Sequence, residues 1–170
     1  MSKLPKGFRG AAIAAGLKSS GALDLTLIEN IGPRFDAAAV YTSNKVVAAP
    51  VIWSREVTKG KLVRAVALNS EAQTLVLARK DLQIHIRPLS PWGELLGISS
   101  GEVVICSTGL IGELLPMPKV LTGLTAIAQK LENESLDDVS RAIMTTDTVP
   151  KVAQATITGT EFVGIAKGAG

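Results

Sequence analysis

The first residues suited to chemistry follow a short apolar run in the stretch VVICSTGLIGE, residues 103–113. The run 103–106 is typical of a strand covered on both faces, and Ser107, Thr108 and Gly109 come directly after it. A chain that changes to hydroxyl and glycine residues at a strand end can turn backbone N–H groups toward a ligand. The alternative interpretation is an ordinary Ser/Thr turn.

Two further places carry polar groups that could contact a ligand. In IMTTDT, residues 143–148, the threonine and aspartate side chains are typical of turns and helix caps. In AKGAG, Lys167 is a single cation among small residues, so its ammonium group could approach a carboxylate closely. A solvated lysine in a flexible tail is the alternative for this residue.

The other reactive residue types predict no site. His85 is the only histidine, and it lacks suitable neighbours for a catalytic triad or a multi-histidine metal site. Cys106 is expected to pack in the core, because its surroundings are apolar. Arg9 and Lys18 are interpreted as surface charges. The sequence contains no Walker loop and no GxGxxG motif, so we expect no metal and no bound cofactor.

The elements that must position these residues are a mixture of strands and helices. Turn residues and hydrophobic spacing predict strands at 10–18, 23–30, 36–44, 45–54, 62–70 and 103–106, and a hairpin around Thr158-Gly159 within 151–170. A helical apolar stripe with an early proline predicts a helix over 117–131. Ser135, with Asp138 three residues later, predicts a capping-box start for a second helix over 135–144. We therefore expect an α/β (mixed α+β) fold in which sheet packs against helices.

Length and composition limit the class of protein. A chain of 170 residues suits one compact domain or one large piece of a bigger fold, and a hydrophobic content of 46% supports a core. The net charge of +3 comes from scattered basic residues and does not favour nucleic acid. There is no apolar run near the roughly 20 residues of a membrane span, no signal-peptide pattern, and only one cysteine. These features predict a cytoplasmic protein without nucleic-acid or membrane partners.

Several segments, taken together, resemble one family. They are GFRGAAIAAGLKSSGALDLTLI, VAAPVIWSRE, VALNS, CSTGLIGELLPMPK, RAIMTTDTVPK and GIAKGAG, and they cover nearly the whole chain outside residues 71 to about 93. In this order they resemble the N-terminal, α part of ornithine acetyltransferase, also called glutamate N-acetyltransferase, of arginine biosynthesis. Each string alone is modest, but their shared order argues against chance similarity.

The resemblance implies a precursor that cuts itself into α and β chains, and a layered α/β/β/α sandwich completed by the β chain. It also implies an assembly of two α and two β chains. In the family, the β chain begins with the nucleophilic threonine, at an Ala-Thr cleavage site a few residues beyond the motif that ends here at Gly170. We therefore expect the nucleophile on the β chain, and not at Thr108, Thr145 or Thr146. Residues 1–170 are expected to form a single α-chain domain that is inactive alone.

The resemblance also implies roles for the candidate residues. Thr108, through its hydroxyl, and Gly109, through its backbone N–H, would form the oxyanion hole of acyl transfer. Thr145 would hydrogen-bond the amino-acid part of the acetylated donor, and Lys167 would bind substrate. The implied reaction moves acetyl from N2-acetyl-L-ornithine to L-glutamate through an acetyl-threonine intermediate. Acetyl-CoA stays open as a second acetyl donor.

One stretch departs from the family. After Asn69-Ser70 the family continues Gly-x-Ala-Asn-Ala, whereas this chain reads EAQTLVLARKDLQIHIRPLSPW. One base added before the codon of Glu71 would allow the missing motif to be read. We therefore interpret residues 71–92 as a frameshifted segment, which arose from a sequencing error or a pair of mutations. If the segment is genuine protein, we expect it to be extruded or poorly ordered, and resequencing distinguishes these origins.

Two other functional classes stay open at this point. An amidase or aminopeptidase with a related N-terminal-nucleophile architecture would share the oxyanion hole, but it would act on amino-acid amides instead of acetylornithine. A non-catalytic fragment is the other alternative, because the expected nucleophile lies elsewhere and residues 71–92 are anomalous.

Overall fold

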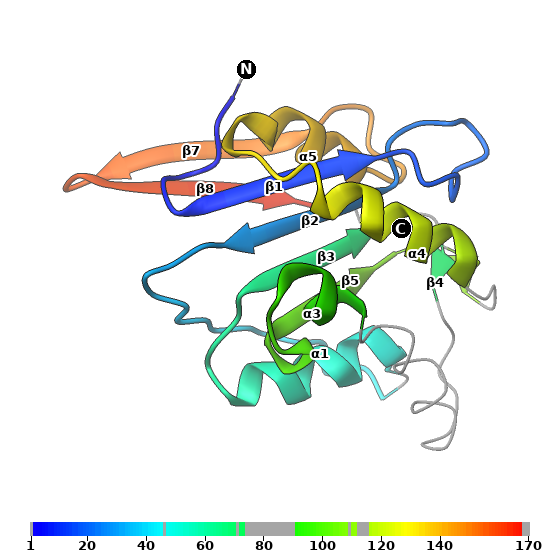
Figure 1. Ribbon diagram of the computed structural model, residues 1–170, viewed down its shortest axis with the longest axis horizontal. Coiled ribbons are helices and arrows are strands. Elements are labelled where there is room, and N and C mark those ends of the chain that lie inside the picture. Colours follow the sequence, from blue (N-terminus) through cyan, green and yellow to red (C-terminus); the bar gives the residue numbers. More distant parts are fainter. Residues whose placement is uncertain are drawn as a thin grey trace.

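A computed structural model describes residues 2–45, 47–70, 72–73, 91–108, 110–111 and 116–167. Within these ranges, strands and helices are mixed along the chain, and helices pack against a central sheet (Figure 1). The predicted α/β class is therefore confirmed. Among the helices described, none is long and apolar enough to cross a membrane.

The central sheet has four strands in the order β1-β2-β3-β5. Their bounds are β1 Phe8–Ile13, β2 Leu25–Asn30, β3 Ala65–Asn69 and β5 Val103–Ser107. The first three strands pair antiparallel, and β3 pairs parallel with β5. Leu25 lies opposite Asn69, and Asn69 lies opposite Ser107. The start of β2 and the ends of β3 and β5 therefore meet at one edge of the sheet, where Thr108 follows.

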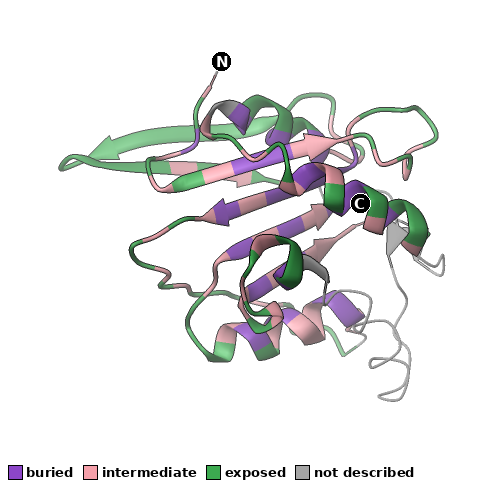
Figure 2. Cartoon of the chain, viewed as in Figure 1, coloured by how far each residue is buried: buried purple, intermediate pink, exposed green. Residues whose placement is uncertain are grey.

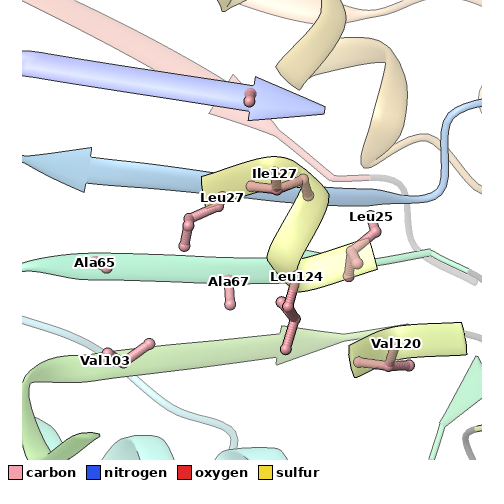
Figure 3. Packing of buried hydrophobic residues seen from close by; sticks show 9 residues of the cluster. Leu25, Leu27, Ala65, Ala67, Val103, Val120, Leu124 and Ile127 are labelled. Atoms are coloured by element: carbon pink, nitrogen blue, oxygen red, sulfur yellow. The ribbon is translucent and has the colours of Figure 1, made fainter. Parts of the chain in front are cut away.

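The core lies between this sheet and α4, Met117–Ala128. Figure 3 shows Val120, Leu124 and Ile127 of this helix lying over the strands. The strands contribute large and small apolar side chains to the same cluster, namely Ala11, Leu25, Leu27, Ala65, Ala67 and Val103. Small residues let the helix approach the sheet closely, and the buried apolar area stabilises the fold at roughly 25 cal/mol per Å². The helix predicted over 117–131 is confirmed, including its early proline.

The strand predicted over 45–54 is wrong, because α1, Ala49–Lys59, begins there. Its proline lies in the first helical turn, where the missing N–H costs nothing. The helix is fixed to β5 by side chains: Trp53 Nε1 donates to Val103 O at 2.9 Å, and Ser54 Oγ donates to Ile105 O at 2.9 Å. These contacts outweigh the strand preference of the valine and isoleucine residues.

The strand predicted over 36–44 is also absent from the described residues, since only Asp36 makes an isolated bridge, to Leu62. This segment is largely exposed. Among the described residues its backbone pairs only at its start, where Ala37 N–H donates to Lys61 O at 2.9 Å beside the Asp36–Leu62 bridge, so no strand forms.

The second helix is confirmed as α5, Leu136–Ala142, but its capping box is wrong. A 3₁₀ turn, η3 Asn133–Ser135, precedes the helix, and the Ser135 side chain makes no cap hydrogen bond. Its hydroxyl donates instead to Glu132 O at 3.0 Å. The 3₁₀ turn gives Ser135 φ −104° and ψ 4°, which is not the extended backbone of an N-cap residue.

The predicted hairpin is confirmed as β7, Lys151–Ile157, and β8, Thr160–Ala166. Its two-residue turn needs positive φ at both positions, and Thr158 and Gly159 have φ 49° and 81°. The hairpin is mostly exposed (Figure 2). It contacts the N-terminal segment, where Gln154 Nε2 donates to Lys3 O at 3.3 Å.

The remaining elements are short. They are β4 Ala72–Gln73, α3 Pro91–Leu96, η2 Ser100–Glu102 and β6 Leu110–Ile111, and β4 pairs parallel with β6. The frameshift hypothesis for residues 71–92 falls largely outside the described residues, as does His85. The interpretation of this segment, and of residues 1–170 as a single α-chain domain, therefore stays a prediction.

Candidate functional site

A buried carboxylate organises the loop between β1 and β2. Asp24 is fully buried. Its Oδ1 accepts the backbone N–H of Ala15 at 2.7 Å, and its Oδ2 accepts those of Leu17 at 2.6 Å and Lys18 at 3.0 Å. Three hydrogen bonds to one carboxylate fix the path of this loop, because charge-assisted bonds are stronger than neutral ones. Asp24 was not among the residues predicted from the sequence.

The Lys18 side chain joins this loop to the turn that follows α5. Its Nζ donates to Leu23 O at 3.0 Å and to Met144 O at 2.8 Å. The interpretation of Lys18 as a surface charge is therefore wrong: the residue is half-buried and lies in the wall of a pocket. Arg9, interpreted in the same way, keeps 42% of its side chain exposed while it pairs with the buried Glu29.

Side chains from distant segments satisfy the carbonyl groups at the C-terminal end of α5. Ser70 Oγ, directly after β3, donates to Ala142 O at 2.6 Å. Lys167 Nζ, directly after β8, donates to Ile143 O at 3.1 Å. A helix end leaves several carbonyl groups without partners, and its partial negative charge attracts cations. The end of α5 therefore draws both Lys18 and Lys167 to one place.

An open pocket of about 630 Å³ lies between this loop and this turn. It is lined by Lys18, Ser19, Ser20, Ala22, Leu23, Arg141, Met144, Thr145, Asp147, Thr148 and Pro150. Thr145, a predicted site residue, has a buried hydroxyl oxygen with no hydrogen-bond partner among the described residues. A buried hydroxyl without a partner costs about 1–3 kcal/mol.

The second predicted substrate residue, Lys167, is held in an unusual electrostatic setting. Burial, and then the positive charge of Lys18, lower the pKa of Lys167 to about 8. The Cys106 thiol and the Asp147 carboxylate act in the opposite direction. With a pKa of about 8, Lys167 is still mostly cationic at neutral pH and can bind a carboxylate there.

Cys106 is half-buried beside Lys167, instead of packing fully in the core. Burial raises the pKa of the Cys106 thiol, and the nearby Lys167 opposes this effect. A thiol with a raised pKa is a weak nucleophile at neutral pH, which agrees with the prediction that Cys106 does not react.

Thr108 lies at the same edge of the sheet, directly after β5. Its backbone N–H donates to Asn69 O at 3.3 Å, and the neighbouring Ser107 hydroxyl donates to Asn69 Oδ1 at 2.8 Å. Gly109, the other predicted oxyanion residue, lies outside the described residues. The structure thus places Lys167 Nζ on the carbonyl of Ile143, two residues before Thr145. It places Thr108 two residues beyond Cys106, the strand residue that interacts with Lys167.

In the part of the chain that the structure describes, no group of three or more His, Cys, Asp or Glu residues could hold a metal ion. The residues that line the pocket instead carry the Lys18 ammonium, the Arg141 guanidinium, the Asp147 carboxylate and several hydroxyls, and the Lys167 ammonium binds the nearby carbonyl of Ile143. Such a set suits a small ligand that carries a carboxylate and further polar groups.

The chain is similar in sequence to proteins of arginine biosynthesis. It matches the ArgJ family over residues 9–170. The arginine biosynthesis bifunctional protein ArgJ of Streptomyces coelicolor is 47% identical over 165 residues, which cover 97% of this chain and 43% of that relative. The chain therefore spans less than half the length of this curated relative.

The fold is similar to crystal structures of the same group. An ornithine acetyltransferase complexed with ornithine, from Mycobacterium tuberculosis, has a TM-score of 0.89 and 38% identity, and the match covers 98% of this chain and 90% of that chain. The arginine biosynthesis bifunctional protein of Bacillus halodurans has a TM-score of 0.83 and 32% identity, with 98% and 88% covered. Because sequence and fold agree over nearly its whole length, the chain belongs to the ArgJ family.

Proposed function

We propose that this chain is the α part of an acetyltransferase of arginine biosynthesis, which moves acetyl from N2-acetyl-L-ornithine to L-glutamate. The observation that carries the proposal is the end of α5, where the pocket residue Thr145 has a hydroxyl without a partner among the described residues. Lys167 Nζ donates to the carbonyl of Ile143, two residues before Thr145. An N-acylated amino acid offers acceptors to both groups, since its carboxylate suits the cation and its amide oxygen suits the hydroxyl. Membership of the ArgJ family supports this choice of substrate.

The nucleophile in this proposal is the N-terminal threonine of a β chain, activated by its own amino group. The lengths of the relatives support two chains. The match covers only 43% of the S. coelicolor relative but 90% of the crystallised M. tuberculosis chain, so that crystallised chain is about as short as this one. We propose an assembly of two α and two β chains, in which the β chain covers the exposed hairpin β7–β8.

The α chain would contribute binding and electrostatic stabilisation to a two-step reaction. The β-chain threonine attacks the acetyl carbonyl, ornithine leaves, and glutamate then takes acetyl from the threonine ester. Each step passes through a tetrahedral oxyanion, which the Thr108 hydroxyl and the Gly109 N–H would stabilise. Lys167 and Thr145 would hold the amino-acid part of the substrate. Acetyl-CoA stays open as a second donor.

Lys167→Ala in the complete two-chain enzyme is expected to raise KM for acetylornithine roughly 10- to 100-fold, with a smaller fall in kcat. The physical reason is the loss of one charge-assisted contact that is present in both the ground state and the transition state. Steady-state kinetics measure both constants. Lys59→Ala is the matched control, because Lys59 is 69% exposed and pairs with Glu56 at the surface.

The same assay tests the proposed function as a whole. An unchanged KM for Lys167→Ala would leave Lys167 with only a structural role, through its contact with Ile143 O. Turnover of amino-acid amides, but not of acetylornithine, by the complete parent enzyme would replace the acetyltransferase with an amidase.

Thr145→Val is expected to raise KM roughly fivefold to tenfold without lowering the thermal stability of the protein. The substitution keeps the shape of the side chain and removes a buried hydroxyl that has no partner among the described residues. Loss of an unsatisfied polar group does not destabilise the fold, whereas loss of a substrate contact weakens binding. Thr125→Val is the control, because the Thr125 hydroxyl is exposed and donates to Leu121 O at 3.2 Å within α4. A large drop in melting temperature with normal KM would contradict a binding role.

A further inference from the structure

Hydrogen bonds fix both the backbone and the side chain of Lys18. Asp24 accepts the Lys18 backbone N–H at 3.0 Å, and Lys18 Nζ donates to Leu23 O at 3.0 Å and Met144 O at 2.8 Å. Residues 18 and 144 lie 126 positions apart in the sequence. This one side chain therefore holds the β1–β2 loop against the turn after α5.

The turn held by Lys18 is the one that presents the proposed substrate residues. Met144, whose carbonyl accepts from Lys18, directly precedes Thr145 in the chain. Ile143, one residue earlier, accepts from Lys167 Nζ at 3.1 Å. Two ammonium groups thus bind consecutive carbonyl groups of one short turn. A displacement of Lys18 would therefore move Thr145, and it would also change the electrostatic potential at Lys167.

We propose that Lys18 is a positioning residue of the substrate pocket, which clamps the turn 143–145 and brings a second positive charge next to Lys167. This inference rests on the proposed function, because it takes Thr145 and Lys167 as substrate contacts. A clamp alone could be made by any hydrogen-bond donor of the right length. The charge of Lys18 adds a second effect, since a neighbouring cation favours the neutral form of Lys167.

The groups that face Lys167 come from three segments. Lys18 comes from the β1–β2 loop, Cys106 from β5 and Asp147 from the loop after α5. After burial, Lys18 is the main cause that lowers the pKa of Lys167 to about 8, while Cys106 and Asp147 raise it. Lys167 is therefore cationic below about pH 8 and loses its charge above it, so KM for a carboxylate substrate should rise as the pH passes this value. Without the Lys18 charge, this rise should begin at a higher pH.

Lys119 of α4 offers a matched control, because it also binds the β1–β2 loop. Its Nζ donates to Gly16 O at 2.8 Å from the side of α4, and this contact is exposed. Lys119 is thus a second lysine that binds a carbonyl group of the β1–β2 loop, but among the described residues its ammonium group makes no hydrogen bond to the turn after α5. If anchoring the loop were the only role of Lys18, Lys18→Met and Lys119→Met would have similar effects.

The test compares Lys18→Met, Lys18→Arg and Lys119→Met in the complete enzyme. Kinetics for acetylornithine are measured across the pH range around 8, and the pH dependence of Lys167 labelling by an amine-selective reagent is followed by mass spectrometry. Lys18→Met is expected to raise KM roughly tenfold with little change in kcat, and to move the titration of Lys167 to higher pH. Lys18→Arg keeps the charge, so it should keep the titration near that of the parent and rescue KM in part. Lys119→Met should leave both unchanged.

Two results distinguish a failure of the positioning role of Lys18 from a failure of the proposed function. If Lys18→Met matches Lys119→Met in KM and in the Lys167 titration, the positioning role is overturned; Lys18→Gln replaces Lys18→Met if the latter does not fold. If the titration moves as expected but Lys167→Ala leaves KM for acetylornithine unchanged, the coupling of the two lysines stands and the proposed function fails.

Discussion

Thr108→Ala in the complete enzyme is expected to lower kcat for acetyl transfer roughly 100-fold or more, with KM little changed. The oxyanion exists only in the transition state and the tetrahedral intermediate, so a donor aimed at it contributes little to substrate binding. Thr108 lies just beyond the end of β5, and its backbone N–H donates to Asn69 O at 3.3 Å. The substitution keeps this backbone contact, so β5 should stay folded.

Ser107→Ala is the matched control for this prediction. The Ser107 hydroxyl donates to Asn69 Oδ1 at 2.8 Å, so its loss should affect local stability more than the transition state. If the complete enzyme forms its two chains by self-cleavage, as the family resemblance implies, that step would also pass through a tetrahedral intermediate. The extent of cleavage is therefore checked by gel electrophoresis before kinetic values are compared. A folded, correctly cleaved Thr108→Ala enzyme with near-normal kcat would mean that residues 107–109 form only a turn.

Asp24→Ala is expected to destabilise the protein by about 3–5 kcal/mol, the range seen when one partner of a buried charged network is removed. Asp24 is fully buried and accepts the backbone N–H groups of Ala15, Leu17 and Lys18. All three donors would lose their acceptor at once, and alanine offers no replacement. Denaturant unfolding of parent and variant under identical conditions measures the difference.

Two further variants show whether the loss of stability in Asp24→Ala comes from its missing hydrogen-bond acceptors. Asp24→Asn keeps one acceptor oxygen, so it should lose less stability than Asp24→Ala. Asp36→Ala removes a carboxylate that is 66% exposed and pairs with Arg34 at the surface, so its effect should stay below about 1 kcal/mol. An equally small effect for Asp24→Ala would show that the loop path does not depend on this carboxylate.

The reliable structural predictions from the sequence concern elements with a clear local pattern. The strands β2, β3 and β5, helix α4 and the hairpin turn at Thr158-Gly159 all form where they were predicted. In each case the local pattern and the tertiary packing favour the same structure. The apolar side chains of α4, for example, recur at helical spacing, and the same residues pack on the sheet.

Elements with an ambiguous local pattern were decided by contacts distant in sequence. Residues 45–54 are rich in valine and isoleucine, which favour strands, but helix α1 starts within this segment. Trp53 and Ser54 bind backbone carbonyl groups of β5, about 50 positions further along the chain. No pattern within the segment itself contains this information.

Some residues of the candidate site were predicted from the sequence, and others were found only in the structure. Thr108, Gly109, Thr145 and Lys167 were selected from the sequence because their motifs resemble those of the family. Asp24 and Lys18 were not selected. Their partners are backbone N–H and carbonyl groups, so the types of the partner residues do not reveal these contacts. The sequence by itself determined the family and the class of fold, and it indicated the candidate residues of the site. Only the tertiary structure decided which charged side chain lies beside Lys167, because that depends on bringing residue 18 to the carbonyl of residue 144.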